Sequence, residues 1–342
     1  MTTTRPKLAF VSPYEHFGAM SGARKRIENL CIALSDDNVK VSCLSPWKID
    51  ADVDHIPYSL EGNFFVKFWN VLRLNWLLWR LKPEVVISES PFAPLPFGRY
   101  RLFHMIHDAK FVTAHGRSKR KIARMVHWVS ARISDGLITV SLSEKNRLLE
   151  ALHLPVDHIL VSYNGVSSAW LEMDRTDRTP LCYDLIFVSN FARHKGHINL
   201  LRAIRGTSFS VVFVGADFGE REQCKKAAID WSLDVTFMQD LSEEELIRIY
   251  DQSRVFVFPS NLEGFGMPYL EARARGLPVV ANDIPVFNEL QQIVGGHIVD
   301  FSNSDQVRSR LMEAMMLTKE VPDLDVFKWS EIATDLLMET RK

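Results

Sequence analysis

The sequence lacks the signs of a disulfide scaffold, a structural metal site or a membrane span. Its four cysteines are scattered, without a C-x-x-C pair and without the spacing of metal ligands. We therefore expect them to be reduced core residues of a cytosolic protein. No uninterrupted apolar stretch reaches the length of about 18 residues at which a transmembrane helix would be expected. The cysteines are Cys31, Cys43, Cys182 and Cys224.

An excess of charge of one sign is also missing. The 41 basic and 42 acidic side chains nearly cancel, and the net charge of −1 gives no support for nucleic acid as a partner. The apolar run near the N-terminus is short and is interrupted by Ser12 and Pro13, so it predicts a first strand and not a signal peptide. With 342 residues, 46% of them hydrophobic, the chain can bury two cores, and we expect two domains.

The stretch 255–290 carries the most specific signal. Residues 255–258 are fully apolar, which is typical of a buried strand in a parallel sheet. A loop with two glycines follows at 261–266, and Pro268 suits the first turn of a helix. The backbone amides at such a helix start form a ready site for an anion.

Two carboxylates frame this turn, Glu263 in the loop and Glu271 inside the predicted helix. Both can face one crevice at the carboxyl end of the strand, because Glu271 lies about one turn into the helix. Either acid alone is explained by the helix dipole, which favours negative charge near a helix N-terminus. The dipole does not explain why a glycine-containing loop, a helix start and two acids occur together.

The run EGFGMPYLEARARGLPVVANDIP, which begins at Glu263, resembles the donor-site signature of the retaining glycosyltransferases of the GT-B fold (glycosyltransferase family 4, group 1). That family includes glycogen-synthase-like enzymes and mannosyltransferase-like enzymes of bacterial cell-surface polysaccharide assembly. Two glutamates with seven residues between them mark its sugar-nucleotide site, and Glu263 and Glu271 have this spacing. The resemblance implies an α/β fold with two Rossmann-like, doubly wound parallel-sheet domains facing a cleft.

Alternating strand and helix patterns run through both halves of the chain and predict the same architecture in each. We expect an N-terminal, acceptor-side domain at 1–165, a polar linker at 166–182 and a C-terminal domain that binds the donor at 183–324. A terminal helix is predicted within 325–342, and in the resembling family a similar tail crosses back onto the first domain.

A pair of cations, Arg193 and Lys195, follows a predicted strand just ahead of Gly196. An Arg fork and a Lys point charge suit a diphosphate, although an isolated Arg-x-Lys is typical of a solvated loop. The family has the same Arg and Lys in this loop, so the resemblance implies that Arg193 and Lys195 bind the donor phosphates. The implied donor-binding set also contains Gly22, Met238, Phe265, Gly266, Met267 and Glu271.

His107 and Asp108 follow a predicted strand at 102–106, at the edge of the sheet where ligands bind. A lone histidine is more often a structural residue than a ligand. Many members of the resembling family carry a His-Asp here, beside the donor sugar. The resemblance therefore implies that His107 contacts the sugar from the first domain, with Asp108 on the acceptor side. The domains would then have to close for the reaction.

Two predicted helices in the first half carry both apolar and basic residues. Residues 64–82 place three tryptophans on one stripe, a pattern that favours core packing and also suits a helix lying in a membrane interface. In 116–134, cations crowd the helix start, where the dipole disfavours them, so this segment is either a solvated face or a contact for anionic lipid headgroups. The stripe is Phe65, Phe68, Trp69, Leu72, Trp76 and Trp79, and the cations are Arg117, Lys119, Arg120, Lys121, Arg124 and Arg132.

The activity that the resemblance implies is transfer of a sugar from GDP-mannose or a UDP-sugar to a glycan or lipid-linked acceptor, with retention at the anomeric carbon. Arg193 and Lys195 would stabilise charge on the leaving phosphate, while Glu271 holds the ribose hydroxyls and Glu263 the sugar hydroxyls. His107, Glu263 and the two cations form the implied catalytic set. We expect no metal and no cofactor, and a cytoplasmic enzyme at the inner face of the cell membrane that contributes to a polysaccharide such as lipopolysaccharide.

Two other functions are compatible with the same residues. A sugar-nucleotide epimerase of this fold would use the acids for elimination and would convert the donor without an acceptor. A non-catalytic protein that binds a nucleotide sugar or lipid would be expected if the set of cations and glutamates were broken. That set is intact in this sequence.

Overall fold

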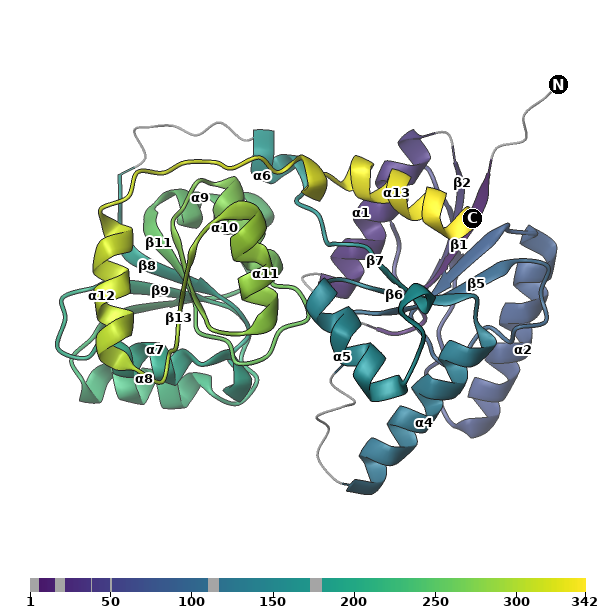
Figure 1. Cartoon of the computed structure of the whole chain (residues 1–342), viewed down its shortest axis with the longest axis horizontal. Helices are drawn as coiled ribbons and strands as arrows, with labels where there is room; N and C mark the ends of the chain where they lie inside the picture. The colour runs from purple at the N-terminus through teal and green to yellow at the C-terminus, as the bar shows by residue number, and fades with distance from the viewer. Residues whose placement is uncertain (1–5, 16–21, 38, 50, 110–116, 173–179) are drawn as a thin grey trace. The chain divides into compact units, whose positions relative to one another are not determined.

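The computed structural model describes residues 6–15, 22–37, 39–49, 51–109, 117–172 and 180–342. The chain divides into two compact units, Met1–Gly165 with Val326–Lys342, and Val166–Asp325. Each unit is a parallel sheet with helices on both faces (Figure 1). The predicted α/β fold with two doubly wound parallel sheets is thereby confirmed.

The first unit is built on seven parallel strands in the order β3-β2-β1-β4-β5-β6-β7. The order runs outward in both directions from β1 and β4, so the topological switch point lies between these two strands. The elements are β1 Lys7–Val11, α1 Gly22–Asp36, β2 Lys40–Ser45, β3 Asp54–Pro57, α2 Phe64–Leu81, β4 Val85–Ser88, β5 Arg101–Ile106, α4 Arg117–Ile133, β6 Gly136–Thr139, α5 Leu142–Leu152, β7 Ile159–Val161 and α13 Trp329–Arg341.

Alternate residues of β1 reach the two faces of this sheet. Leu8 and Phe10 belong to a core cluster completed by α1 and α13, whereas Ala9 belongs to a second cluster on the other face, beneath α2. This is the two-residue period expected of a strand that is buried on both faces.

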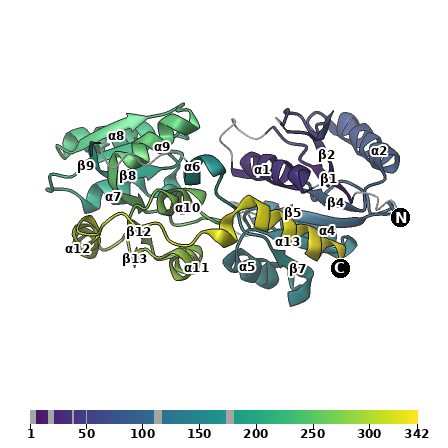
Figure 2. The same ribbon diagram turned by 90° about the horizontal axis from the view of Figure 1, so that it is seen from above.

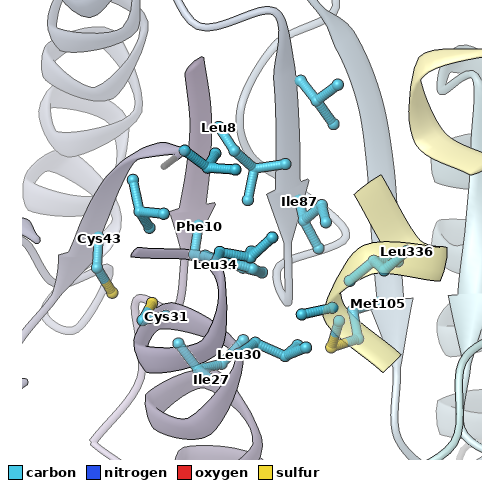
Figure 3. Packing of buried hydrophobic residues seen from close by; sticks show 14 of the residues in the cluster. Leu8, Phe10, Ile27, Leu30, Cys31, Leu34, Cys43, Ile87, Met105 and Leu336 are labelled. Carbon is cyan, nitrogen blue, oxygen red and sulfur yellow. The ribbon is translucent and has the colours of Figure 1, made fainter. Parts of the chain in front are cut away.

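The last helix of the chain, α13, packs on the first unit. It lies against α1 in both views of the ribbon (Figures 1 and 2). Figure 3 shows Leu336 of α13 beside Met105 of β5, in the same cluster as Phe10 and Leu30. The core of the first unit is therefore completed by residues from the far end of the chain.

Helix α2 spans the predicted segment, but the prediction that its tryptophan stripe packs against the core is wrong. The stripe is exposed, and the helix is anchored by Leu74 and Leu78 on its opposite side. Both sides of this helix are apolar, so periodicity alone selects neither. Among the described helices, none is long and apolar enough to cross a membrane.

Three of the four cysteines are buried as expected: Cys31, Cys43 and Cys224. Cys31 lies in α1 and Cys43 in β2, within one core cluster (Figure 3). The prediction is wrong for Cys182, which is exposed just ahead of the first strand of the second unit. An apolar strand pattern begins one residue later, so this exposure could not be predicted from the pattern.

The second unit is built on six parallel strands in the order β10-β9-β8-β11-β12-β13, with its switch point between β8 and β11. The elements are α6 Ser168–Glu172, β8 Tyr183–Val188, α7 His197–Ala203, β9 Ser210–Val214, α8 Arg221–Asp230, β10 Asp234–Met238, α9 Glu243–Asp251, β11 Ser253–Phe258, α10 Met267–Ala274, β12 Val279–Asn282, α11 Pro285–Val294, β13 His297–Val299 and α12 Ser304–Met315.

The segment predicted as a linker begins with structure of its own. Trp170 of α6 is buried, its ring packs edge-on against Tyr250 of α9, and its Nε1 donates to Glu243 at 3.1 Å. This part of 166–182 is thus packed into the second unit. Residues 173–179 lie outside the described residues.

Candidate functional site

Opposite charges meet at the switch point of the second unit. Arg193 and Lys195 lie in a 3₁₀ turn after β8, and Glu263 lies in the loop after β11. Lys195 Nζ is 2.7 Å from Glu263 Oε1, with the two side chains 18% and 12% exposed. The two strands are neighbours in the sheet, and ligands of open parallel sheets bind at the carboxyl ends of such a strand pair.

The two loops are also joined through their backbones. The Asn261 amide donates to the His194 carbonyl at 2.8 Å. Gly196 has a φ of 77°, and a Cβ at this position would lie 2.4 Å from the Pro259 carbonyl oxygen. Glycine is therefore required here both for the left-handed backbone and for the close approach of the second loop.

Asn282 is a supporting residue that the sequence did not single out. It is buried at the end of β12 and donates to the Ser260 carbonyl at 3.2 Å and to Asn261 Oδ1 at 3.0 Å. Its own Oδ1 accepts from the Phe301 amide at 3.1 Å. These bonds fix the loop that leads to Glu263. The available signal in the sequence was an asparagine directly after the apolar run at 278–281.

Helix α10 starts as predicted, with Met267 as its first residue and Pro268 in its first turn. Its N-cap is Gly266, at a φ of 101°, and glycine offers no side-chain acceptor to the first amides. The loop that leads into these amides contains Glu263, the partner of Lys195, and the amides suit an anion. Phe265 is buried, so its backbone rather than its ring is the part that could reach a ligand.

Glu271 is buried in α10 and accepts a hydrogen bond from the Tyr250 hydroxyl of α9 at 3.3 Å. Burial, and then the Glu271 carboxylate, raises the pKa of Tyr250 well above its usual value, so Tyr250 is neutral and acts as the donor. Glu263 and Glu271 thus have different partners, Lys195 and Tyr250, on different elements.

The remaining predicted donor residues of this unit differ in position. Arg193 is exposed, next to the Lys195 pair. Met238 ends β10, two strands away from β8, and its carbonyl accepts from the Gly215 amide at 3.0 Å. Met238 therefore lies at the same edge of the sheet but not at its switch point.

The switch point of the first unit holds a second polar group. Glu89 follows β4, and its carboxylate accepts a short hydrogen bond from Ser12, which follows β1. His107, directly after β5, has its Nε2 2.6 Å from Glu89 Oε1. The predicted residue His107 is thus held by Glu89, an acid that was not predicted to belong to the site. The available signal was a carboxylate directly after the apolar strand at 85–88.

Arg26 of α1 is a fully buried cation whose charge interacts with Glu89 of this group. It donates to the Tyr163 carbonyl at 2.6 Å, to Asn164 Oδ1 at 2.8 Å and to Ser162 Oγ at 2.7 Å. Burial lowers the pKa of Arg26 to about 9, which leaves it charged at neutral pH. The nearby negative charge of Glu89 opposes this shift.

Two other predicted residues lie near this edge of the first sheet. Gly22 is the first residue of α1 and is exposed, while residues 16–21 before it lie outside the described residues. Asp108 follows His107 and is half-buried.

A metal site was not expected, and this stays a prediction. Within the described residues, no group of three His, Cys, Asp or Glu side chains could hold a metal ion. The sequence has two D-x-D tripeptides, ending at Asp54 and Asp325. Asp54 begins β3, at the opposite edge of the sheet from His107, and Asp325 lies between α12 and α13.

Two family models match consecutive parts of the chain. Residues 20–170 match "Glycosyltransferase Family 4", and residues 182–322 match "Glycosyl transferases group 1". The serotype-specific mannosyltransferase WbdA of Escherichia coli is 34% identical over 115 residues, which are 31% of this chain and 14% of WbdA. The chain thus matches about a seventh of that relative's length. The O-antigen chain mannosyltransferase B of Escherichia coli is 24% identical over 79% of this chain and 73% of its own length.

Solved structures show the same fold. A glycosyltransferase of Rickettsia africae superposes with a TM-score of 0.73 at 16% identity, over 98% of this chain and 93% of its own. Anabaena HepE in complex with UDP and glucose superposes with a TM-score of 0.69 at 15% identity, over 98% of this chain and 95% of its own.

Proposed function

The chain belongs to the glycosyltransferases, with a family 4 domain followed by a group 1 domain, and from this premise we propose that it transfers a sugar from a nucleoside diphosphate sugar to a glycan or lipid-linked acceptor. The acceptor belongs to a cell-surface polysaccharide such as O-antigen or lipopolysaccharide. GDP-mannose is the first donor to test, because the relatives named above are mannosyltransferases. UDP-sugars are the second, because HepE was solved with UDP and glucose.

The observation that carries this proposal is the Lys195–Glu263 pair at the β8/β11 switch point. Without a donor, the ammonium is neutralised by the carboxylate. A diphosphate bound between Arg193, Lys195 and the first amides of α10 would recruit the ammonium, because the diphosphate carries two negative charges and the glutamate one. Glu263 would then be released to accept hydrogen bonds from the sugar hydroxyls.

The other residues take the roles that the family resemblance implies. Glu271 binds the ribose hydroxyls, and His107 contacts the transferred sugar. Positive charge from Arg193 and Lys195 stabilises the leaving diphosphate, so the reaction needs no metal. The anomeric configuration is retained. We also propose that the enzyme acts in the cytoplasm, with the cations of α4 at an anionic membrane surface.

Lys195→Ala is the direct test. Purified protein is incubated with GDP-mannose and several UDP-sugars, with and without a lipid-linked acceptor and in the presence of EDTA, and the released nucleoside diphosphate is measured. We expect acceptor-dependent release from one donor, reduced about 100-fold or more by Lys195→Ala and by Glu263→Gln. Lys225→Ala, which removes an exposed ion pair on α8, is the matched control and should behave as wild type.

Two results would contradict the proposal. Wild-type turnover in both active-site variants would show that the Lys195–Glu263 pair has no role in the reaction. Conversion of the donor into an isomer without acceptor would indicate an epimerase, a function that the comparisons do not favour.

A further inference from the structure

Helix α2 presents an aromatic face to solvent. Its exposed side chains include Phe65, Trp69 and Trp79, at 73%, 66% and 71% of their full area, and the neighbouring members of the stripe are exposed as well. Monomeric proteins rarely expose contiguous apolar surface on this scale unless it binds a partner. The full set is Phe64, Phe65, Val66, Phe68, Trp69, Leu72, Trp76 and Trp79.

This face is not an unfinished core contact. Leu74 and Leu78, the two buried residues of α2, pack with Ala9 and Val86 of the sheet. At about 100° per residue they lie on the side of the helix opposite to the aromatic stripe. The helix is therefore fixed to its own domain by one apolar side, and the aromatic side remains exposed for another contact.

The charged side chains of α2 have one sign. Residues 64–81 contain three cations and no acid. The Arg80 guanidinium lies over the Trp76 ring, 4.9 Å from its centroid, so the cation extends along the apolar surface instead of away from it. Aromatic side chains with flanking cations are typical of helices that lie in a membrane interface.

A second helix on the same face of the sheet has the same composition. Leu102 of β5 packs in the cluster beneath α2, and Ile106, four residues on, packs with Ala131 of α4, so both helices cover one face. Helix α4 contains six cations and no acid. Five of its large apolar side chains are exposed: Ile122, Met125, Trp128, Val129 and Ile133.

We propose that α2 inserts its aromatic stripe into the interface of an anionic membrane, with α4 supplying cations and further apolar contact on the same face. The occupant follows from charge: nine cations and no acid on two helices contrast with a net charge of −1 for the whole chain. A second copy of the chain would bring this cationic surface against itself, and like charges would oppose the contact. The inference deepens the membrane contact proposed for α4 and does not depend on the transferase reaction.

Vesicle co-sedimentation of the full chain tests this. The probes are vesicles of phosphatidylcholine alone and of phosphatidylcholine with phosphatidylglycerol. We expect binding to the anionic vesicles with a blue shift of tryptophan emission, and at least a tenfold loss of binding in the Phe65→Ser, Trp69→Ser, Trp79→Ser variant. The matched control replaces three exposed apolar residues of the second unit, Phe218, Ile229 and Met316, by Ser and should bind as wild type.

A charge variant separates the two helices. Arg120→Ser with Lys121→Ser should weaken binding to anionic vesicles while the tryptophan shift at saturation persists. Arg124 is left in place, because its guanidinium donates to the Ala151 carbonyl at 2.6 Å and holds α4 to α5.

Three outcomes would overturn the proposal: no binding of wild type to anionic vesicles, unchanged binding of the aromatic variant, or a wild-type dimer that the aromatic variant converts to a monomer without any vesicle binding. Nucleoside diphosphate release with a water-soluble acceptor is measured in parallel. If wild type releases no nucleoside diphosphate, the proposed reaction is contradicted, while the result on membrane binding still holds.

Discussion

The imidazole of His107 is oriented by a buried carboxylate. Glu89 Oε1 lies 2.6 Å from Nε2, and the Glu89 side chain is only 4% exposed. Because Nε2 is engaged in this way, Nδ1 is the ring nitrogen that can reach a ligand. Glu89 is therefore a positioning residue that acts through His107.

Glu89→Gln should reduce kcat/KM with the donor roughly tenfold, since the neutral amide orients the ring less strongly. The informative measurement is a double-mutant cycle. In a His107→Ala background the Glu89→Gln change should have little further effect, because the group it positions is gone. Additive losses would show that Glu89 acts independently of His107.

Burial keeps His104, His127 and His197 neutral. Burial lowers the pKa of His104 and of His127 to about 4, and the pKa of His197 to about 3. In the unfolded chain a histidine titrates near its ordinary pKa of about 6.5. Below that pH the unfolded state binds protons that the folded state does not, so folding stability decreases as the pH falls.

The expected loss is up to about 1.4 kcal/mol per pH unit for each histidine between its unfolded and folded pKa. Chemical denaturation of the whole chain between pH 7.5 and 5 measures it. His197→Leu should flatten the dependence of the transition in which the second unit unfolds. An equally steep dependence in that variant would assign the effect to other groups.

Residue identities at the site were within reach of the sequence, but their contacts were not. The motif and the resemblance predicted Lys195 and Glu263, yet their pairing depends on β8 and β11 being neighbours in the sheet. Glu89 and Asn282 were missed for the same reason. Their partners come from other strands, and a single sequence does not give the strand order.

At the scale of elements, the close approach of the 3₁₀ turn and the loop after β11 depends on one glycine, Gly196. Gly196→Ala would place a Cβ 2.4 Å from the Pro259 carbonyl and would hold alanine at a φ of 77°. We expect a loss of at least about 1–3 kcal/mol of stability from backbone strain, increased by the clash.

Gly206→Ala is the matched control, because Gly206 has a φ of 80° and open space where its Cβ would lie. The difference between the two variants in unfolding free energy isolates the clash. Equal losses would mean that the two loops are not tightly joined. Donor binding should weaken in Gly196→Ala alone.

Elements with a regular period were predicted well, and those with two apolar sides were not oriented correctly. Helix α9 begins with a capping box, in which Ser242 and Glu245 exchange hydrogen bonds, and a serine followed three residues later by a glutamate is its sequence signature. Helices α11 and α12, with β13 between them, were not predicted. In α2 the choice between two apolar sides depends on what the rest of the fold already covers, so pattern alone could not make it.

At the scale of the whole molecule, α13 is the last element in sequence and part of the first core. Leu336 is buried there with Met105 and Leu30, whereas Met338 on the same helix is exposed. Leu336→Ala should therefore lower the unfolding free energy of the first unit by about 2–5 kcal/mol. Met338→Ala should stay within about 0.5 kcal/mol of wild type.

Chemical denaturation of each variant measures the difference in unfolding free energy. Equal stabilities for the two variants would mean that α13 is only loosely attached. A larger loss in the second unit than in the first would contradict the position of this helix.

The return of α13 also sets an order of events during synthesis. Ribosomes deliver the chain from its N-terminus, and domains generally fold as they emerge. Here the segment 1–165 leaves the ribosome first but must wait for 329–341, so the second unit can finish folding while the first still exposes the apolar surface that α13 will cover. The nascent N-terminal half is thus the part of the chain with the greatest need for a chaperone.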